Sequence, residues 1–108
     1  MKIQQWEIWK ARPPGFEKDH WFVIVTGQER LNSPRHSQVN GLACFTLRSE
    51  PLKTDVRLNS ADGFETATVC QCDLLYFLDK NKLHSPLGIV SWERQQLIKS
   101  KLKEVFRL

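Results

Sequence analysis

The stretch WFVIVT at residues 21–26 consists of two aromatic and four β-branched residues, a composition typical of a buried β-strand. Similar short runs recur along most of the chain, at residues 3–9, 39–47, 54–58 and 66–78. Between and within them lie clusters rich in Pro, Gly, Asn, Asp and Ser, which favour turns: residues 12–15, 32–34, 40–41, 49–51 and 59–63. This succession predicts a small antiparallel sheet or barrel of about five to seven strands.

The last part of the sequence is patterned differently. After Ser91, a residue type that favours the N-cap position, apolar side chains follow the period of an α-helix, with basic residues elsewhere. The apolar positions are Trp92, Leu97, Ile98, Leu102, Val105 and Phe106. This pattern predicts one amphipathic helix that covers the sheet. No long linker, repeat or low-complexity segment interrupts the chain, so we expect a single, mainly β domain over residues 1–108, a barrel with a C-terminal helix.

Composition excludes several classes of protein. Hydrophobic residues make up 41% of the chain and charged residues 26%, which is too apolar for an intrinsically disordered protein. Neither a secretory signal nor an apolar run as long as a membrane span is present, so we expect a cytoplasmic protein that does not contact the membrane. Cys44, Cys70 and Cys72 are then expected to be reduced. Cys70 and Cys72 lack the ligand spacing of a zinc site, so we expect no metal and no cofactor.

Several short motifs follow one another in a fixed order. They are Glu7-Ile8-Trp9, Gly15-Phe16-Glu17, His20-Trp21 leading into Phe22-Val23-Ile24-Val25, Ala43-Cys44-Phe45-Thr46, Gly63-Phe64, Thr68 to Asp73, and Phe77-Leu78-Asp79-Lys80. Each motif alone is weak, but their order and spacing over almost the whole chain resemble the MazF/PemK family of toxins. The resemblance implies a β-barrel with helix, the SH3-like barrel of the CcdB/PemK/MazF type.

The same resemblance implies a function. It suggests a sequence-specific, metal-independent endoribonuclease in which a 2′-hydroxyl of single-stranded RNA attacks the adjacent phosphate. Such a reaction needs a base, an acid and donors that stabilise the phosphorane, but no metal ion. The resemblance further implies a homodimer and a cognate antitoxin protein that lays an acidic segment across the RNA groove. The net charge of +4 agrees with both polyanionic partners without proving either.

Three residues match the catalytic positions that the resemblance implies. Thr46 matches a Thr or Ser that could hydrogen-bond the scissile phosphate, and Asp73 matches an acidic position that acts as a base in some relatives. His20 takes the place of an arginine, because the Arg-Pro dipeptide of the family is His20-Trp21 here. Histidine changes charge near neutral pH and can exchange a proton beside a phosphate, but it lacks the bidentate fork of arginine. We therefore expect catalysis from His20, Thr46 and Asp73.

A wider set is expected to bind RNA: Glu17, Lys18, Trp21, Arg35, His36, Arg48 and Gln71. Trp21 offers an aromatic surface on which a base can stack, or it simply fills the place of the family's proline. Arg35 and His36 lie where family members carry a mobile loop that contacts RNA. Strand alternation puts Gln71 and Asp73 on one face, where they would share a groove, and the neighbouring cysteines on the other.

Structural roles compete with each of these assignments. Asp73 is equally suited to a turn or a surface ion pair, Thr46 to an ordinary strand position, and His20 to a loop that leads into a strand. Without the family's arginine, the barrel is also compatible with an inactive module that binds nucleic acid or protein. A gyrase poison of the CcdB type, acting on DNA, is less favoured, because the C-terminal residues Phe106 to Leu108 do not resemble the CcdB terminus.

Overall fold

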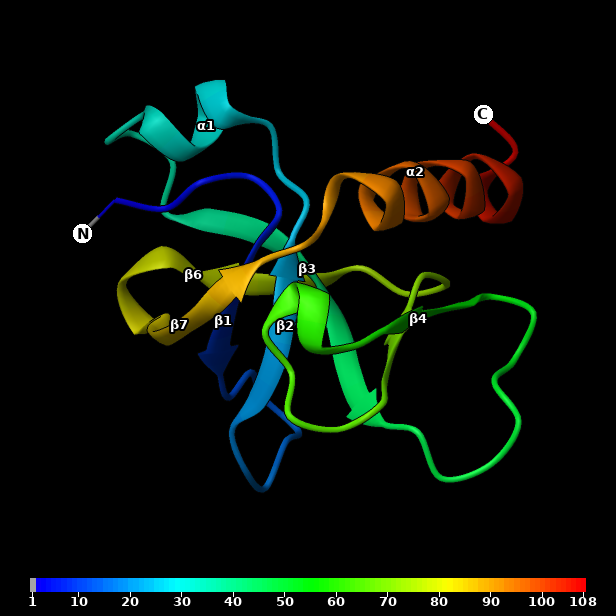
Figure 1. Ribbon diagram of the computed structural model, residues 1–108. Helices are drawn as coiled ribbons and strands as arrows, with labels where there is room; N and C mark the ends of the chain where they lie inside the picture. Colours follow the sequence, from blue (N-terminus) through cyan, green and yellow to red (C-terminus); the bar gives the residue numbers. More distant parts are fainter. Residues whose placement is uncertain (1) are drawn as a thin grey trace.

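A computed structural model describes residues 2–108 as an antiparallel sheet and two α-helices (Figure 1). The elements are β1 (Glu7–Ala11), β2 (His20–Ile24), α1 (Gln28–Asn32), β3 (Gln38–Thr46), β4 (Asp55–Leu58), β5 (Thr68–Gln71), β6 (Tyr76–Asp79), β7 (His84–Ile89) and α2 (Trp92–Phe106). Short 3₁₀ turns, η1 (Ser60–Asp62) and η2 (Lys80–Lys82), precede β5 and β7. The strand order is β4-β5-β3-β2-β1-β7, and β6 also pairs with β3. The sheet is barrel-like but not closed, which confirms the predicted mainly β class.

Strand β3 organises the sheet because it pairs with three others. Its first half, Gln38–Gly41, pairs with β6, and its last residues, from Cys44 to Thr46, pair with β5. Strand β2 lies along residues 41–44. At Gly41 the strands come so close that an added Cβ would lie 2.6 Å from Leu78 Cδ1. Because Gly41 has no side chain, Leu78 of β6 can pack against β3 at the point where the pairing of β3 with β6 ends.

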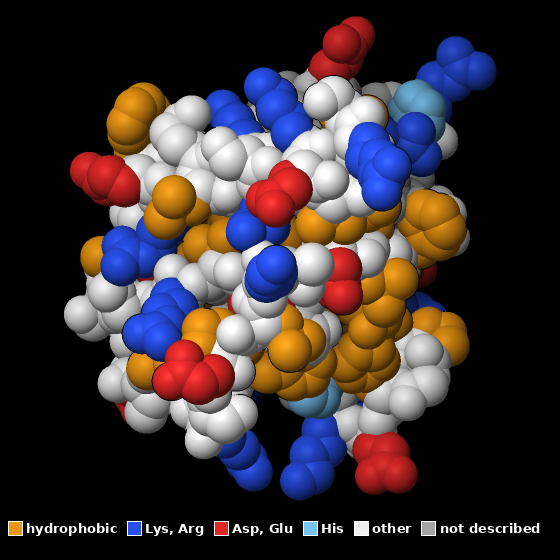
Figure 2. All heavy atoms as spheres, turned by 90° about the vertical axis from the view of Figure 1, so that its right-hand side faces the viewer, with side chains coloured by type: hydrophobic (Ala, Val, Ile, Leu, Met, Phe, Trp, Pro, Cys, Tyr) orange, Lys and Arg blue, Asp and Glu red, His pale blue; other side chains and the backbone are white. Residues whose placement is uncertain are grey.

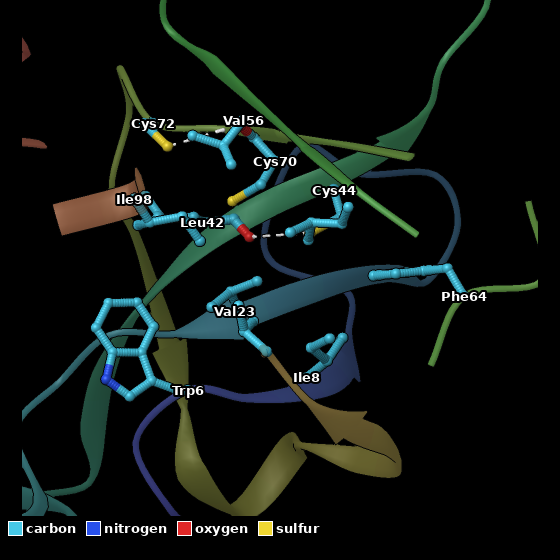
Figure 3. Close-up of a cluster of buried hydrophobic side chains, with 12 residues drawn as sticks. Trp6, Ile8, Val23, Leu42, Cys44, Val56, Phe64, Cys70, Cys72 and Ile98 are labelled. Atoms are coloured by element: carbon cyan, nitrogen blue, oxygen red, sulfur yellow. Dashed lines mark hydrogen bonds between the residues drawn. The ribbon is translucent and has the colours of Figure 1, made fainter. Parts of the chain in front are cut away.

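Both faces of the central strands are buried, so the molecule has two hydrophobic clusters. Alternation along β1, β2 and β3 sends Ile8, Val23 and Leu42 into one cluster, which α2 and β4 complete (Figure 3). Their neighbours Trp9, Phe22 and Ala43 enter the other, which β6 and α1 cover. Near-continuous apolar runs such as residues 21–26 are required because neither face of these strands is left to solvent.

Helix α2 begins directly after Ser91, as predicted, and lies against β4. The buried Asp62 of η1 fixes this start: its Oδ1 accepts a hydrogen bond of 2.7 Å from the Ser91 amide, and its Oδ2 lies 3.4 Å from Arg94 Nε. The predicted apolar stripe is only partly correct. Ile98 is fully buried, whereas three members of the stripe are exposed: Trp92, Leu97 and Phe106. Ile98 packs into the core cluster and Leu102 packs against it, while the other apolar side chains of the stripe stay partly or fully exposed.

Helix α1 was not expected from the sequence, which suggested a charged loop. It is a single turn whose C-terminal carbonyls are bound by Lys80, a residue of η2. The Lys80 ammonium donates to the carbonyl oxygens of Arg30, Leu31 and Ser33 at 3.0, 3.0 and 2.9 Å. These bonds satisfy groups that a helix end leaves unpaired. A long-range contact therefore stabilises a helix that is too short to be stable by itself.

The predicted runs agree with β1 to β4 apart from their ends. The run at 66–78 is two strands, β5 and β6, separated by a connection that starts at Cys72. Strand β7 was not predicted, because Pro86 and exposed polar residues hide it and it lies at the end of the strand order. No helix in the part of the chain that the structure describes is long and apolar enough to cross a membrane.

Candidate active site

A pocket of about 750 Å³ opens beside the end of β3. Its walls come from the start of β2 with the preceding Asp19, from the end of β3 with the nearby Arg48, from the segment 63–66, and from β5 and β7. The polar and aromatic side chains that matter for chemistry there are Asp19, His20, Trp21, Thr46, Arg48 and Glu65. Four of these six were predicted from the sequence as site residues. The pocket thus brings together side chains from separate segments of the chain.

His20 is the first residue of β2 and is half-buried between two aromatic rings. Its imidazole centroid lies 4.9 Å from that of Phe16 and 5.2 Å from that of Phe45. Among residues 2–108 its imidazole forms no hydrogen bond and no ion pair, so the rings orient it while both nitrogens stay available to a ligand. His20 also lines a smaller hollow of about 300 Å³, shared with Glu17 and Lys18.

Thr46 ends β3 directly opposite Thr68 of β5. The buried Thr68 donates its hydroxyl to the Thr66 carbonyl at 3.0 Å, so that hydroxyl is already engaged. Thr46 is exposed, and within the described chain its hydroxyl has no partner. Arg48, two residues later, lines the same pocket. A hydroxyl and a guanidinium therefore face one space, an arrangement suited to a phosphate.

Trp21 forms an aromatic wall of the pocket. Its ring meets Phe64 edge-on, with centroids 6.4 Å apart, and the Lys10 ammonium lies 4.9 Å from the indole centroid. Both contacts hold the indole in one orientation, and the ammonium is attracted by the ring's electron-rich face. A fixed, half-buried indole at the edge of a pocket offers a surface on which a base can stack.

Asp19 ties the loop between β1 and β2 to β7 at the mouth of the pocket. Its Oδ1 lies 3.1 Å from Arg12 Nε, and its Oδ2 lies 3.0 Å from His84 Nε2. Partial desolvation raises the pKa of Asp19. The hydrogen bond and charge of Arg12, together with a smaller contribution from His84, lower the pKa by more than desolvation raises it. The net pKa lies below its ordinary value, and the carboxylate stays ionised and engaged with both partners.

Six predicted site residues do not line the main pocket: Glu17 and Lys18 line the smaller hollow, and four others line neither. Asp73 is exposed and lies two residues beyond the end of β5, while Gln71 pairs with Asp55 of β4. Thr46 is opposite Thr68, and Asp73 lies five residues after Thr68 in the sequence. If the chain between them is extended, Asp73 is roughly 16 Å from Thr68. Burial alternates as predicted, with Cys70 and Cys72 buried and Gln71 and Asp73 more exposed, but neither Gln71 nor Asp73 lines the pocket.

The other two predicted residues in this group lie near α1. His36 lines a separate hollow of about 400 Å³ with Arg30 and Ser33, and its Nδ1 is 2.9 Å from Ser33 Oγ. Arg35 beside it is exposed. Sequence analysis missed Asp19 and Glu65 in the main pocket. No local signal marks them, because their neighbours in the pocket come from other segments.

Cys44 of β3, Cys70 of β5 and Cys72, directly after β5, all lie on the interior side of the sheet. Cys44 is directly opposite Cys70, and all three thiols are buried and free. A hydrogen bond with Cys44 is the largest effect that raises the pKa of Cys70, and a hydrogen bond with Cys70 does the same for Cys72; burial raises both further. Within residues 2–108, no group of three or more His, Cys, Asp or Glu side chains is arranged to hold a metal ion.

No family model and no curated protein sequence matches the chain. Solved structures do match it. A mycobacterial endoribonuclease in complex with its cognate antitoxin superposes with a TM-score of 0.82 at 20% identity, over 98% of this chain and 96% of that chain. The toxin MazF-mt6 of Mycobacterium tuberculosis gives 0.80 at 19% identity, over 94% of this chain and 97% of that chain.

A more distant match comes from a MazE–MazF structure from Deinococcus radiodurans, with a TM-score of 0.76 at 11% identity, over 98% of this chain and 96% of that chain. The chain therefore has the barrel fold of a small bacterial toxin. That fold is the MazF fold, as the order of its sequence motifs implied.

Proposed function

We propose that this chain is a divergent MazF-type toxin that cleaves single-stranded RNA as a metal-independent, sequence-specific endoribonuclease. One observation carries the proposal. His20 and Thr46, which belong to separate sequence motifs, line the same pocket in a chain with the MazF fold. Structures with this fold include proteins named as endoribonucleases and toxins. The unpaired imidazole and hydroxyl are groups that phosphodiester cleavage requires.

The pocket suggests how the residues divide the work. Thr46 donates its hydroxyl to a non-bridging oxygen of the scissile phosphate, and Arg48 supplies the positive charge that opposes the phosphorane. His20, in its protonated form, gives a proton to the departing 5′-oxygen. Trp21 stacks a base next to the scissile bond. The chemistry takes place between the RNA's own 2′-hydroxyl and phosphate, so the proposal requires no cofactor.

RNA that extends past the pocket meets further predicted residues. Glu17 and Lys18 line the smaller hollow on the other side of His20, where an adjacent nucleotide would lie. Arg35 and His36 are exposed beside α1, and Gln71 lies on β5. We propose that these three contact RNA outside the scissile dinucleotide. The catalytic role of Asp73 stays a prediction from the resemblance, without support from the pocket.

We also propose a homodimer and a cognate antitoxin as partners. Hydrophobic side chains gather in a patch on the face of Figure 2, with basic side chains above and below. Large apolar residues are exposed on β6 and α2, among them Phe77, 73% exposed, and Trp92, 69% exposed. Such surface favours protein contacts. The net charge of +4 suits an acidic antitoxin segment, and solved structures with this fold contain an antitoxin or MazE.

A second function rests on one specific observation. His20 stands where the resemblance places an arginine, and an imidazole cannot form arginine's bidentate contact with phosphate. A barrel that binds RNA without cutting it would show this loss. The two functions differ in whether the RNA backbone is broken, and one assay separates them.

The test is incubation of purified protein with a long single-stranded RNA in EDTA, followed by gel analysis and a parallel binding measurement. We expect cleavage by the wild type and a loss of about 100-fold or more in His20→Ala. Thr46→Val, which removes only the hydroxyl, should lose activity as well, whereas Thr54→Val outside the pocket should not. RNA that is bound but stays intact at high protein concentration would support the binding module. RNA that is neither bound nor cut would contradict both functions.

A further inference from the structure

Two carboxylates line the main pocket, and their surroundings differ. Asp19 has one oxygen bound to Arg12 and the other to His84. Taking up a proton would break at least one of these contacts, and the pKa of Asp19 is already lowered by them. Asp19 is therefore a poor acceptor for a substrate proton. Its role is to hold the loop between β1 and β2 against β7.

Glu65 is the other carboxylate, and it is exposed at the pocket wall. Within the described residues it forms no hydrogen bond or ion pair, so its oxygens are free to accept a proton. The backbone on both sides is anchored. Phe64 is buried, and its amide donates to the Asn59 carbonyl at 3.3 Å, while the Thr66 carbonyl accepts from the Thr68 hydroxyl at 3.0 Å.

An imidazole and a guanidinium line the pocket together with this carboxylate. His20 and Arg48 line the same cavity from β2 and from the chain after β3, whereas Glu65 belongs to the segment that leads into β5. Transesterification by a 2′-hydroxyl needs a base and an acid at different atoms of the substrate. A carboxylate without a partner and an imidazole without a partner, on separate elements around one pocket, provide such a pair.

We propose that Glu65 is the general base of RNA cleavage and that His20 is the matching general acid. This assignment rests on the proposed ribonuclease function. The Glu65 carboxylate takes the proton of the 2′-hydroxyl as O2′ forms a bond to phosphorus. The bond from phosphorus to the 5′-oxygen breaks, and that oxygen takes a proton from the His20 imidazolium. The products are a 2′,3′-cyclic phosphate and a 5′-hydroxyl, with Glu65 left protonated and His20 neutral.

The first experiment compares single-turnover cleavage rates of the full-length variants Glu65→Gln, Asp73→Asn and Glu93→Gln. Glu65→Gln keeps the shape of the side chain but removes the basic carboxylate, so we expect its rate to fall by about 100-fold or more. Glu93→Gln, an exposed carboxylate of α2 outside the pocket, is the matched control and should cleave like the wild type. A loss in Asp73→Asn with full activity in Glu65→Gln would overturn the assignment.

A second experiment separates the base from the acid. An RNA with sulfur in place of the scissile 5′-oxygen has a leaving group that departs without protonation, so it relieves a missing acid but not a missing base. We expect this substrate to restore cleavage by His20→Ala and not by Glu65→Gln. If the sulfur substrate restored cleavage by Glu65→Gln, the role of Glu65 as the base would be overturned.

The two levels of proposal fail in different ways. If the wild type leaves RNA intact, the ribonuclease function and the role of Glu65 fall together. If the wild type cuts RNA and Glu65→Gln binds and cuts it equally well, the ribonuclease stands and only the base assignment falls. A changed cleavage sequence with an unchanged rate in Glu65→Gln would instead assign this residue to base recognition.

Discussion

Cys44, Cys70 and Cys72 show what their surroundings do to a reactive side chain. The sequence separates the last two by one residue, which puts both thiols on the same face of a strand, and that face is the interior. Hydrogen bonding among the thiols and burial raise the pKa of Cys70 and Cys72 well above the ordinary value. Cys70 and Cys72 are therefore core side chains in which the neutral thiol is favoured over the thiolate.

Because the pKa values of these thiols are raised on folding, the free energy of unfolding should fall at alkaline pH. In the folded chain the thiols stay protonated, while in the unfolded chain they ionise at the ordinary pKa of 9.0. Their contribution is therefore fully present below pH 9.0 and is lost as the pH rises above it, by roughly 1 kcal/mol per pH unit for each thiol. Urea unfolding between pH 8 and 10.5 measures this slope. The Cys70→Ala, Cys72→Ala double variant should be less stable but show a shallower slope, and an equal slope would contradict the explanation.

At the scale of elements, β3 determines the shape of the sheet. It pairs with β6 along its first half and with β5 at its end, while β2 accompanies its middle. Gly41 lies where β2 and β6 both flank the strand. The absence of a side chain lets Leu78 and Phe22 occupy the space above it. The dipeptide Asn40-Gly41 looked like a turn in the sequence, but the glycine serves close packing inside a strand.

Substitution of this glycine should therefore destabilise the protein. In Gly41→Ala the new Cβ would lie 2.6 Å from Leu78 Cδ1 and 3.1 Å from Phe22 Cβ, so the core must shift. We expect a loss of about 1–3 kcal/mol in the free energy of unfolding, measured by urea denaturation. Gly27→Ala is the control, since no atom lies within 4 Å of its new Cβ, and it should leave the free energy of unfolding within about 0.5 kcal/mol of the wild type. Equal effects at the two positions would refute the packing argument.

At the scale of the whole molecule, α2 completes a core that the open sheet cannot enclose. Figure 3 shows Ile98 of the helix pointing toward Leu42 and Cys72. Asp62 fixes where this helix starts, through its hydrogen bond to Ser91 and its ion pair with Arg94. The helix thus stabilises the barrel from outside the sheet, and the pocket lies among other elements.

Truncation of Ile98 tests this role. Ile98→Ala removes a fully buried side chain between helix and sheet, so we expect a loss of about 2–5 kcal/mol in the free energy of unfolding. Leu97→Ala, at a position that is 56% exposed, should change it by about 0.5 kcal/mol or less. Chemical denaturation followed by tryptophan fluorescence measures both. If the two variants lose equal stability, the helix does not form the core as described.

The sequence by itself determined the class of fold, because burial on both faces of β2 and β3 demands the apolar, β-branched runs that are visible along the chain. It also predicted His20, Trp21, Thr46 and Arg48 as site residues, and these four line one pocket. Residue spacing could not reveal that β5 ends before Asp73, or that Glu65 joins the pocket. Only the tertiary structure decided these points, because the pocket joins segments that are distant in the chain and strand ends depend on long-range pairing.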